Sequence, residues 1–289
     1  MQKLEHQNKM RSQNRYNKIV SQIKPNSNKS ILIVVTLLSF IAGALLSLVA
    51  ISKITRQLPI ISFSATSETS IQQEAILHYA TSKIVPQQSL QEIMQSFNVL
   101  RTRAPCNFLI FGLGYDSLMW AALNPGGTTL FLEESEEWVK LVLKDAPFLQ
   151  AKTVTYRTQL QEADSLLESY KDNPKCDPRT AFLKGNEECP LALESLPNEV
   201  YETEWDVIMI DAPRGWEREH PGRMAAIYSM AVMARARKGA GNTHVYVHDV
   251  NRVVEKKFAK EFLCDKYKVG GVGRLWHFEI PPSRSATFC

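Results

Sequence analysis

The feature that most constrains the fold is a regular alternation of short apolar strands with helical segments from residue 107 onward. Because alternation of this kind is typical of a parallel sheet with helices on both faces, the sequence predicts a doubly wound α/β domain. Strands are expected at 107–112, 128–133, 152–157, 205–211 and 243–249, with a late strand within 273–282. Helices are expected at 116–123, 135–144, 160–170, 222–237 and 251–263. The segment 172–200, with two cysteines and four prolines, is interpreted as an insertion before the fourth strand.

A second constraint lies upstream of the sheet. Residues 31–51 carry no charged side chain, and this length of apolar chain is enough to cross a bilayer as a helix. A buried core helix is the alternative, but core helices this long are rarely apolar all round. Nine Lys and Arg and one acid lie in 1–56, mostly before the apolar segment, which favours a cytosolic N-terminus. We therefore expect a cytosolic tail (1–30), a transmembrane signal-anchor (31–51), a stem (52–72) and a lumenal domain (73–289), with helices at 71–84 and 89–103.

The charge and the cysteine content of the expected lumenal part limit the functions that it can have. Outside 1–56 the chain has 25 basic and 29 acidic residues, which argues against a nucleic-acid-binding body. The five cysteines, at 106, 176, 189, 264 and 289, form no CxxC motif and no zinc-ribbon spacing. In an oxidising lumen they are better interpreted as disulfide partners. Cys176 and Cys189 flank a short loop and are the first pair expected, and the odd count leaves at least one cysteine outside such pairs.

The first predicted strand runs into a glycine turn, FGLGYDS, at 111–117. Gly112 and Gly114 allow a sharp bend and the close approach of a ligand, and Asp116 or Ser117 can cap the following helix. Ser117 stands where a dinucleotide fingerprint has its third glycine, which weakens the case for NAD, and the chain has no P-loop motif. A plain strand-to-helix turn remains the alternative.

An acid ends the second predicted strand. A carboxylate at this position accepts the hydroxyls of a ribose in dinucleotide-binding folds, so Glu133 is the candidate, with Glu134 as its neighbour. The alternative is the acid-rich start of a helix. The glycine turn and the acid together favour an adenosine-containing ligand.

Polar residues also follow the fourth and fifth predicted strands. Asp211 follows four apolar residues, and His248, Asp249 and Asn251 follow the fifth strand. The carboxyl edge of a parallel sheet is where doubly wound proteins bind ligands, so these side chains are candidates for the reaction site. The alternatives are that Asp249 is a helix cap and His248 a core histidine.

The loop at 213–223 leaves the sheet at the same edge. Arg214 and Arg223, with Arg218, could grip a carboxylate through paired hydrogen bonds, and Trp216 could stack on a sugar face. An exposed loop without a ligand is the alternative.

The motifs PCNFLIFGLGYDSLMW, NPGGTTLFLEE, EWDVIMIDAPRG, PGRMAAIY, VHDVN and GRLWHFEIPP resemble the plant family of cell-wall glucuronic acid O-methyltransferases. That family includes glucuronoxylan 4-O-methyltransferases and arabinogalactan O-methyltransferases, and the segments YRTQLQEADSLLESYK and KGNEECPLALESLP are more similar to the arabinogalactan branch. The resemblance runs from about residue 75 to the end of the chain. It implies a Rossmann-like class I methyltransferase sheet in a type II protein of the Golgi membrane.

The resemblance also implies an activity and a set of site residues. The expected activity is transfer of a methyl group from S-adenosylmethionine to the 4-hydroxyl of glucuronic acid side chains on a polysaccharide. The cofactor turn would be Gly112, Gly114, Asp116 and Ser117, with Glu133 on the ribose and Asp211, His248 and Asp249 at the reaction edge. Tyr115 stands where the family is expected to have His, and Gly215-Trp216-Glu217 replaces a Tyr-Phe or Tyr-His sequence. If position 115 touches the substrate, acceptor choice would differ here.

Two mechanisms remain open at this point. In one, His248 is the general base and Asp211 or Asp249 orients it, or one of these acids is itself the base. In the other, Asp211, Asp249 and Asn251 hold a divalent metal that acidifies the hydroxyl. A non-catalytic scaffold of the same fold is a further alternative, because one related branch tied to xylan deposition has no clear enzymatic role. A Golgi glycosyltransferase is disfavoured, since the chain has no D-x-D motif.

Overall fold

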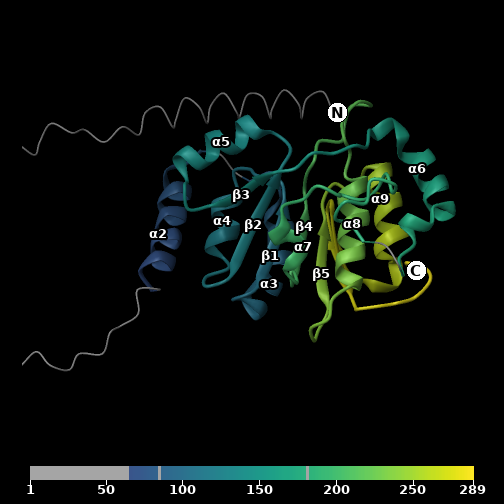
Figure 1. Ribbon diagram of the computed structural model, residues 1–289. Coiled ribbons are helices and arrows are strands. Elements are labelled where there is room, and N and C mark those ends of the chain that lie inside the picture. Colours follow the sequence, from purple (N-terminus) through teal and green to yellow (C-terminus); the bar gives the residue numbers. More distant parts are fainter. Residues whose placement is uncertain (1–64, 84–85, 180–181) are drawn as a thin grey trace, which may run out of the picture. The chain divides into compact units, whose positions relative to one another are not determined.

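The computed structural model describes residues 65–289, apart from 84–85 and 180–181 (Figure 1). Residues 68–289 form one compact unit. The expected tail and signal-anchor lie outside the described residues, as does the stem up to residue 64. Among the described helices, none has the length and apolar content needed to cross a membrane.

The compact unit is built on a seven-stranded sheet with the order β3-β2-β1-β4-β5-β7-β6. The first five strands are parallel, and β7 runs antiparallel to both β5 and β6. The chain reverses direction across the sheet between β1 and β4, so ligand-binding loops are expected where these two strands end. The strands are β1 (Asn107–Phe111), β2 (Thr128–Glu133), β3 (Gln150–Thr153), β4 (Val207–Ile210), β5 (Thr243–Val247), β6 (Lys268–Val272) and β7 (Leu275–Ile280).

Alternate residues of the central strands bury into two separate apolar clusters, one on each face of the sheet. In β1, Leu109 and Phe111 belong to one cluster and Phe108 and Ile110 to the other. This follows from the two-residue period of side chains along a strand. Helices α8 (Met224–Arg235) and α9 (Val253–Phe258) cover the first face, and α3 (Leu90–Arg103), α4 (Ser117–Ala122) and α5 (Glu136–Asp145) cover the second (Figure 1).

The sequence located most of these elements but misplaced several boundaries. The third strand ends at Thr153 and not at 157, and α2 (Ala65–Thr81) begins before the expected residue 71, within the part assigned to the stem. The strand β6 was not predicted, because two of its five residues are glycines and it carries no apolar run. The remaining helices are α6 (Ala163–Ser169), α7 (Asn198–Glu202), the π-helical turn Ala259–Leu263 and the 3₁₀ turns Leu160–Glu162, Tyr170–Asp172, Pro174–Cys176 and Asp265–Tyr267.

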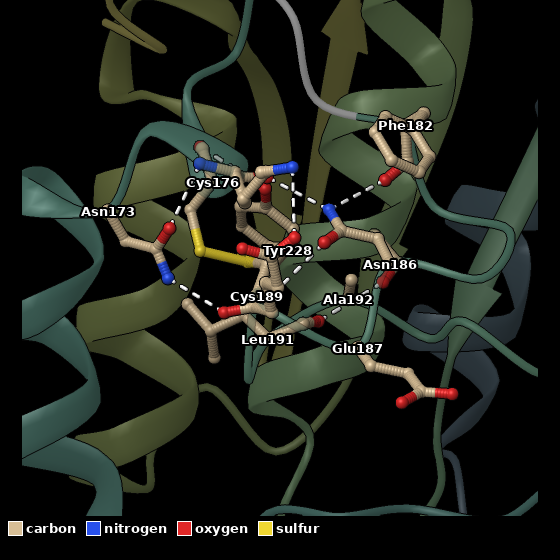
Figure 2. The surroundings of a disulfide bond; sticks show 12 residues. Asn173, Cys176, Phe182, Asn186, Glu187, Cys189, Leu191, Ala192 and Tyr228 are labelled. Atoms are coloured by element: carbon tan, nitrogen blue, oxygen red, sulfur yellow. Dashed lines mark hydrogen bonds and ion pairs between the residues drawn. A yellow bond between two sulfur atoms is a disulfide. The ribbon is translucent and has the colours of Figure 1, made fainter.

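A disulfide organises the insertion before β4, and the predicted pairing of Cys176 with Cys189 is confirmed (Figure 2). The Asn186 side chain donates to the carbonyls of Lys175 and Phe182, each at 2.9 Å. Tyr228 of α8 donates to the Cys176 carbonyl at 3.2 Å. The insertion therefore packs on α8, which explains why this helix is buried almost all round.

A second disulfide joins Cys264 to the last residue, Cys289. It places Phe288 in an aromatic cluster with Tyr228 and Phe262. Cys106 is free and buried, so the expectation of an odd cysteine is also confirmed.

Replacing both Cys176 and Cys189 by Ser should lower the free energy of unfolding by about 3 kcal/mol. The disulfide closes a loop with a sequence separation of 13 residues, and its loss restores chain entropy to the unfolded state. Guanidinium unfolding of both proteins would measure the difference, with Cys106→Ser as the control for loss of a thiol outside a disulfide. Equal midpoints for the double variant and the wild type would contradict the prediction.

Candidate active site

The glycine turn after β1 has the backbone geometry that the sequence suggested. Gly112 has φ +120°, and a Cβ at this position would lie 3.3 Å from Cβ of Ala212, beside the end of β4. The positive φ therefore disfavours any side chain at this position, and a Cβ would also be crowded by Ala212. The Gly114 amide donates to the Ser117 hydroxyl at 2.9 Å, and Ser117 is buried. The buried Ser117 hydroxyl thus stabilises the turn. This structural role adds to the cofactor-binding role that the sequence predicts.

Asp116 begins helix α4 without accepting a capping hydrogen bond from it. Its carboxylate instead accepts from the indole nitrogen of Trp120 at 2.8 Å. Burial and the nearby charge of Asp211 raise the pKa of Asp116 to about 6. The glycine turn also lies against the end of β4, since a Cβ on Gly112 would be 3.7 Å from the carbonyl carbon of Asp211.

Glu133 connects the loops that follow the first two strands. It is buried, and its two carboxylate oxygens accept from the amides of Leu113, at 3.1 Å, and Ser135, at 3.2 Å. An ionised carboxylate has about four acceptor positions, so it can accept a ligand hydroxyl in addition. Its neighbour Glu134 pairs with Arg214 at 3.0 Å, so Glu133, and not Glu134, is the acid that accepts from the glycine turn.

The predicted reaction-edge residues Asp211, His248 and Asp249 do come together. Their nearest possible ligand atoms all lie within 4.8 Å of one another. Nδ1 of His248 lies 2.8 Å from Oδ1 of Asp211, and its Nε2 has no hydrogen-bond partner among the described residues. Asp249 has φ +59°, an unusual conformation for a residue with a side chain, so its place is fixed by its contacts.

Exposure separates the roles of these three residues. The Asp211 side chain is 22% exposed, whereas those of His248 and Asp249 are 1% and 6% exposed. Burial favours the neutral form of Asp211, but His248 and Arg223 outweigh it and hold the pKa of Asp211 below its usual range. Burial also opposes the charging of His248, but Asp211 outweighs it and raises the pKa of His248. Asp211 is therefore the charged group that a ligand can reach, and His248 supports it from behind.

Arg223 does not lie where a substrate would meet it. It is 4% exposed, and its guanidinium lies 2.9 Å from Asp249 and 3.3 Å from Asp211. It also donates to the backbone carbonyls of His248 and Asp211, both at 2.6 Å. The prediction that Arg223 grips the substrate is not supported, because the buried guanidinium is occupied in holding the two acids. A sequence cannot separate these roles, since both require an arginine near the sheet edge.

The other predicted substrate residues have contacts within the protein. Arg214 is half exposed and paired with Glu134. The Trp216 ring packs edge-on against His220, with 4.7 Å between ring centroids. The Tyr115 carbonyl accepts from the Tyr79 hydroxyl of α2 at 2.5 Å, which ties the cofactor turn to an upstream helix.

Three residues that the sequence did not single out surround the cluster. Gln88 donates to Asp211 at 3.3 Å, a Glu92 oxygen lies 3.7 Å from Nε2 of His248, and Arg274 donates to Asp249 at 2.7 Å. Ser89 and Glu92 form a capping box at the start of α3, for which the S-x-x-E pattern at 89–92 is the sequence signal. That signal indicates a helix start but does not reveal that Glu92 lies beside His248, which follows β5.

The predicted metal set does not fit this arrangement. Asn251 is exposed. The Asp249 carboxylate accepts from Arg274 on one oxygen and is paired with Arg223 and Arg252, each at 2.9 Å, on the other. A metal bound to Asp249 would have to displace guanidinium groups that already balance its charge. The predicted metal set of Asp211, Asp249 and Asn251 is therefore not supported.

The sheet order and the polar residues at its carboxyl edge define a Rossmann-like α/β protein. The family model described as IRX15/IRX15L/GXM matches residues 91–278. Over 227 residues the chain is 63% identical to Arabinogalactan O-methyltransferase 2 of Arabidopsis thaliana, covering 78% of each chain. It is 66% identical to Arabinogalactan O-methyltransferase 1 (74% of each chain) and 51% identical to Glucuronoxylan 4-O-methyltransferase 1 (74% of this chain and 75% of that one), both also from Arabidopsis thaliana. The chain belongs to the IRX15/IRX15L/GXM family.

Proposed function

We propose that the protein transfers a methyl group from S-adenosylmethionine to the 4-hydroxyl of glucuronic acid residues on arabinogalactan glycans. The observation that carries this proposal is the shared site. A glycine turn with a buried acid, Glu133, lies at one part of the sheet edge, and a reachable carboxylate, Asp211, lies at another. Gly112 of the turn lies beside Asp211 and Ala212, so a ligand held by the turn would meet a second ligand at Asp211.

Methyl transfer from a sulfonium to an alcohol needs alignment and the removal of one proton. Bound S-adenosylmethionine would supply the methyl group. Glu133 would accept hydrogen bonds from its ribose, and the turn at 112–116 would position the rest of the molecule. Asp211 would accept the hydrogen bond of the acceptor hydroxyl and take its proton as the new bond forms. His248 and Arg223 keep Asp211 ionised and fixed in position, which reduces the reorganisation needed during the reaction.

Relatives favour arabinogalactan over xylan as the acceptor polymer. Identity is 63–66% to the two arabinogalactan O-methyltransferases and 48–51% to the three glucuronoxylan 4-O-methyltransferases. We therefore place the glucuronoxylan activity second. A non-catalytic role in xylan deposition is the third candidate.

The proposed location is the Golgi membrane, with residues 31–51 as a signal-anchor and the compact unit in the lumen. The apolar segment and the positive charge before it support this orientation. Two disulfides within the compact unit also support it, because such bonds persist in oxidising compartments. Protease protection of the compact unit in sealed Golgi vesicles would test the orientation.

Calorimetry on the full-length chain in detergent would test the cofactor assignment. We expect micromolar binding of S-adenosylmethionine, weakened at least about tenfold in Glu133→Gln, because the variant cannot accept the same charge-assisted hydrogen bonds. Glu137→Gln, at an exposed position on α5, is the matched control and should bind like the wild type. Absence of binding by a folded wild-type chain would overturn the enzyme assignment and favour the scaffold.

A further inference from the structure

A cavity of about 650 Å³ opens beside the Asp211–His248–Asp249 cluster. Its walls are residues 86–90 and part of the first turn of α3, and the β6–β7 turn at Gly273 and Arg274 closes the other side. The volume is within the range of ordinary small-ligand sites. None of the residues predicted from the sequence to bind cofactor or substrate lines this cavity.

Three residues of the cavity wall each contact a different member of the cluster. Gln88 donates to Asp211, Arg274 donates to Asp249, and Glu92 lies beside His248. The Glu92 carboxylate is itself fixed by the amides of Arg274, at 2.6 Å, and Ser89, at 2.7 Å. Gln88 therefore lies both at the cavity wall and against the reacting carboxylate.

Gln88 carries an unmet hydrogen-bonding group at this boundary. Its side chain is 3% exposed, and its amide nitrogen contacts Asp211 and the sulfur of Met209. Its carbonyl oxygen, Oε1, is buried and has no hydrogen-bond partner among the described residues. A buried acceptor without a partner costs free energy, which a hydrogen bond from a ligand hydroxyl would recover.

The cavity also offers an apolar surface of a kind that suits a sugar ring. Leu90 is 70% exposed at the cavity wall, and Pro86 and Ile93 are partly exposed beside it. A pyranose has an apolar face of C–H groups and a rim of hydroxyls. Apolar side chains with a few convergent polar groups match this pattern.

We propose that this cavity binds the terminal uronic acid ring of the acceptor, with Gln88 as a specificity-determining residue. Its amide nitrogen holds Asp211, and its Oε1 accepts a hydrogen bond from a ring hydroxyl next to the one that is methylated. The Arg274 guanidinium, whose side chain is 32% exposed, lies at the cavity wall and is a donor that a ring carboxylate could share with Asp249. This inference rests on the proposed methyl transfer and names the place where the acceptor binds.

The first experiment compares Gln88→Ala with Gln91→Ala in the full-length chain. Gln91 lies three residues further on, in the first turn of α3, is exposed and does not line the cavity. We expect Gln88→Ala to reduce kcat/KM for a glucuronic-acid-bearing arabinogalactan oligosaccharide at least about 30-fold, with S-adenosylmethionine affinity changed by less than twofold. Gln91→Ala should match the wild type in both. Equal behaviour of the two variants, or equal loss of cofactor and acceptor affinity in Gln88→Ala, would overturn the proposal.

A second pair of variants tests the charge of the ligand. Leu90 is the first residue of α3, where an acid is compatible with the helix, so Leu90→Glu should fold. We expect it to raise the KM for the anionic oligosaccharide about tenfold through charge repulsion, while the neutral control Leu90→Gln raises it by less than threefold. The difference should shrink at high salt, because salt screens exposed charges. Equal KM values for the two variants at low salt would show that an anionic ring does not bind in this cavity.

Different results would overturn the proposed methyl transfer and the assignment of the cavity. A wild-type chain that binds S-adenosylmethionine but methylates no glucuronic-acid polymer would overturn the proposed function and this inference with it. A fully active wild type whose Gln88→Ala variant keeps its acceptor KM and kcat would overturn only the assignment of the cavity.

Discussion

Replacing Asp211 by Asn should reduce kcat for methyl transfer at least about 100-fold while leaving S-adenosylmethionine affinity within about threefold of the wild type. Asp211 is the one ionised group of its cluster that a ligand can reach, and Asn can neither take the hydroxyl proton nor pair with a charged His248. Loss of a positioned acid–base group typically costs a factor of 10² to 10⁴. Steady-state kinetics and calorimetry on the same preparations would measure both quantities.

Asp206→Asn is the matched control for this substitution. Asp206 lies just before β4, at the opposite edge of the sheet, and pairs with Arg237 at 2.8 Å. It accepts a hydrogen bond from the Asn107 amide, so its loss should affect stability and not turnover. An Asp211→Asn variant that kept more than a tenth of the wild-type kcat would refute the assignment of Asp211 as the reacting carboxylate.

The same variant should change the titration of His248. Asp211 raises the pKa of this histidine, so the pair contributes stability below pH 6.5 that is lost as pH rises through the folded pKa. In Asp211→Asn the partner charge is absent, and the pKa of His248 should fall because burial then dominates. Proton NMR of the histidine ring across pH 5–9 would detect the shift. An unchanged His248 pKa would mean that Asp211 is not its electrostatic partner.

The fold could be predicted from local patterns wherever a strand was apolar on both faces. Segments such as FLIF at 108–111 and VIMI at 207–210 are buried on both sides, and their runs of apolar residues identify them. Strand β6 could not be predicted in this way, because its side chains are largely exposed and it pairs with β7 through a tight hairpin. Its position matters for function, since the β6–β7 turn places Arg274 against Asp249.

The sequence could predict the site residues that directly follow a strand. It could not predict those that lie before the first strand. The ends of β1, β2, β4 and β5 meet at one edge, so Gly112, Glu133, Asp211 and His248 could be grouped from the sequence alone. Gln88 and Glu92 lie before the first strand, and no local pattern relates them to that edge. The sequence also could not show that Arg223 is buried, because an arginine among charged loop residues gives the same signal whether it faces solvent or an acid.

Replacing Arg223 by Ala should lower the free energy of unfolding by about 3–5 kcal/mol, the usual cost of removing one partner from a buried ion pair. The guanidinium balances Asp211 and Asp249 at once and satisfies two backbone carbonyls. Chemical unfolding would measure the loss, with Arg214→Ala as the control. Arg214 is half exposed and pairs with one acid, so its removal should cost less than about 1 kcal/mol.

The physical reason for this loss of stability can be tested by also removing the charge of Asp249, the acid that loses a partner in Arg223→Ala. In Arg223→Ala the Asp249 carboxylate keeps Arg252 and Arg274 but loses one of its three cations. Adding Asp249→Asn should therefore recover part of the stability, about 1–2 kcal/mol, since neighbouring charges in one network are not additive. Strictly additive losses would show that Arg223 stabilises the fold through its backbone contacts alone. Loss of acceptor affinity at unchanged stability would instead restore Arg223 as a substrate-binding residue.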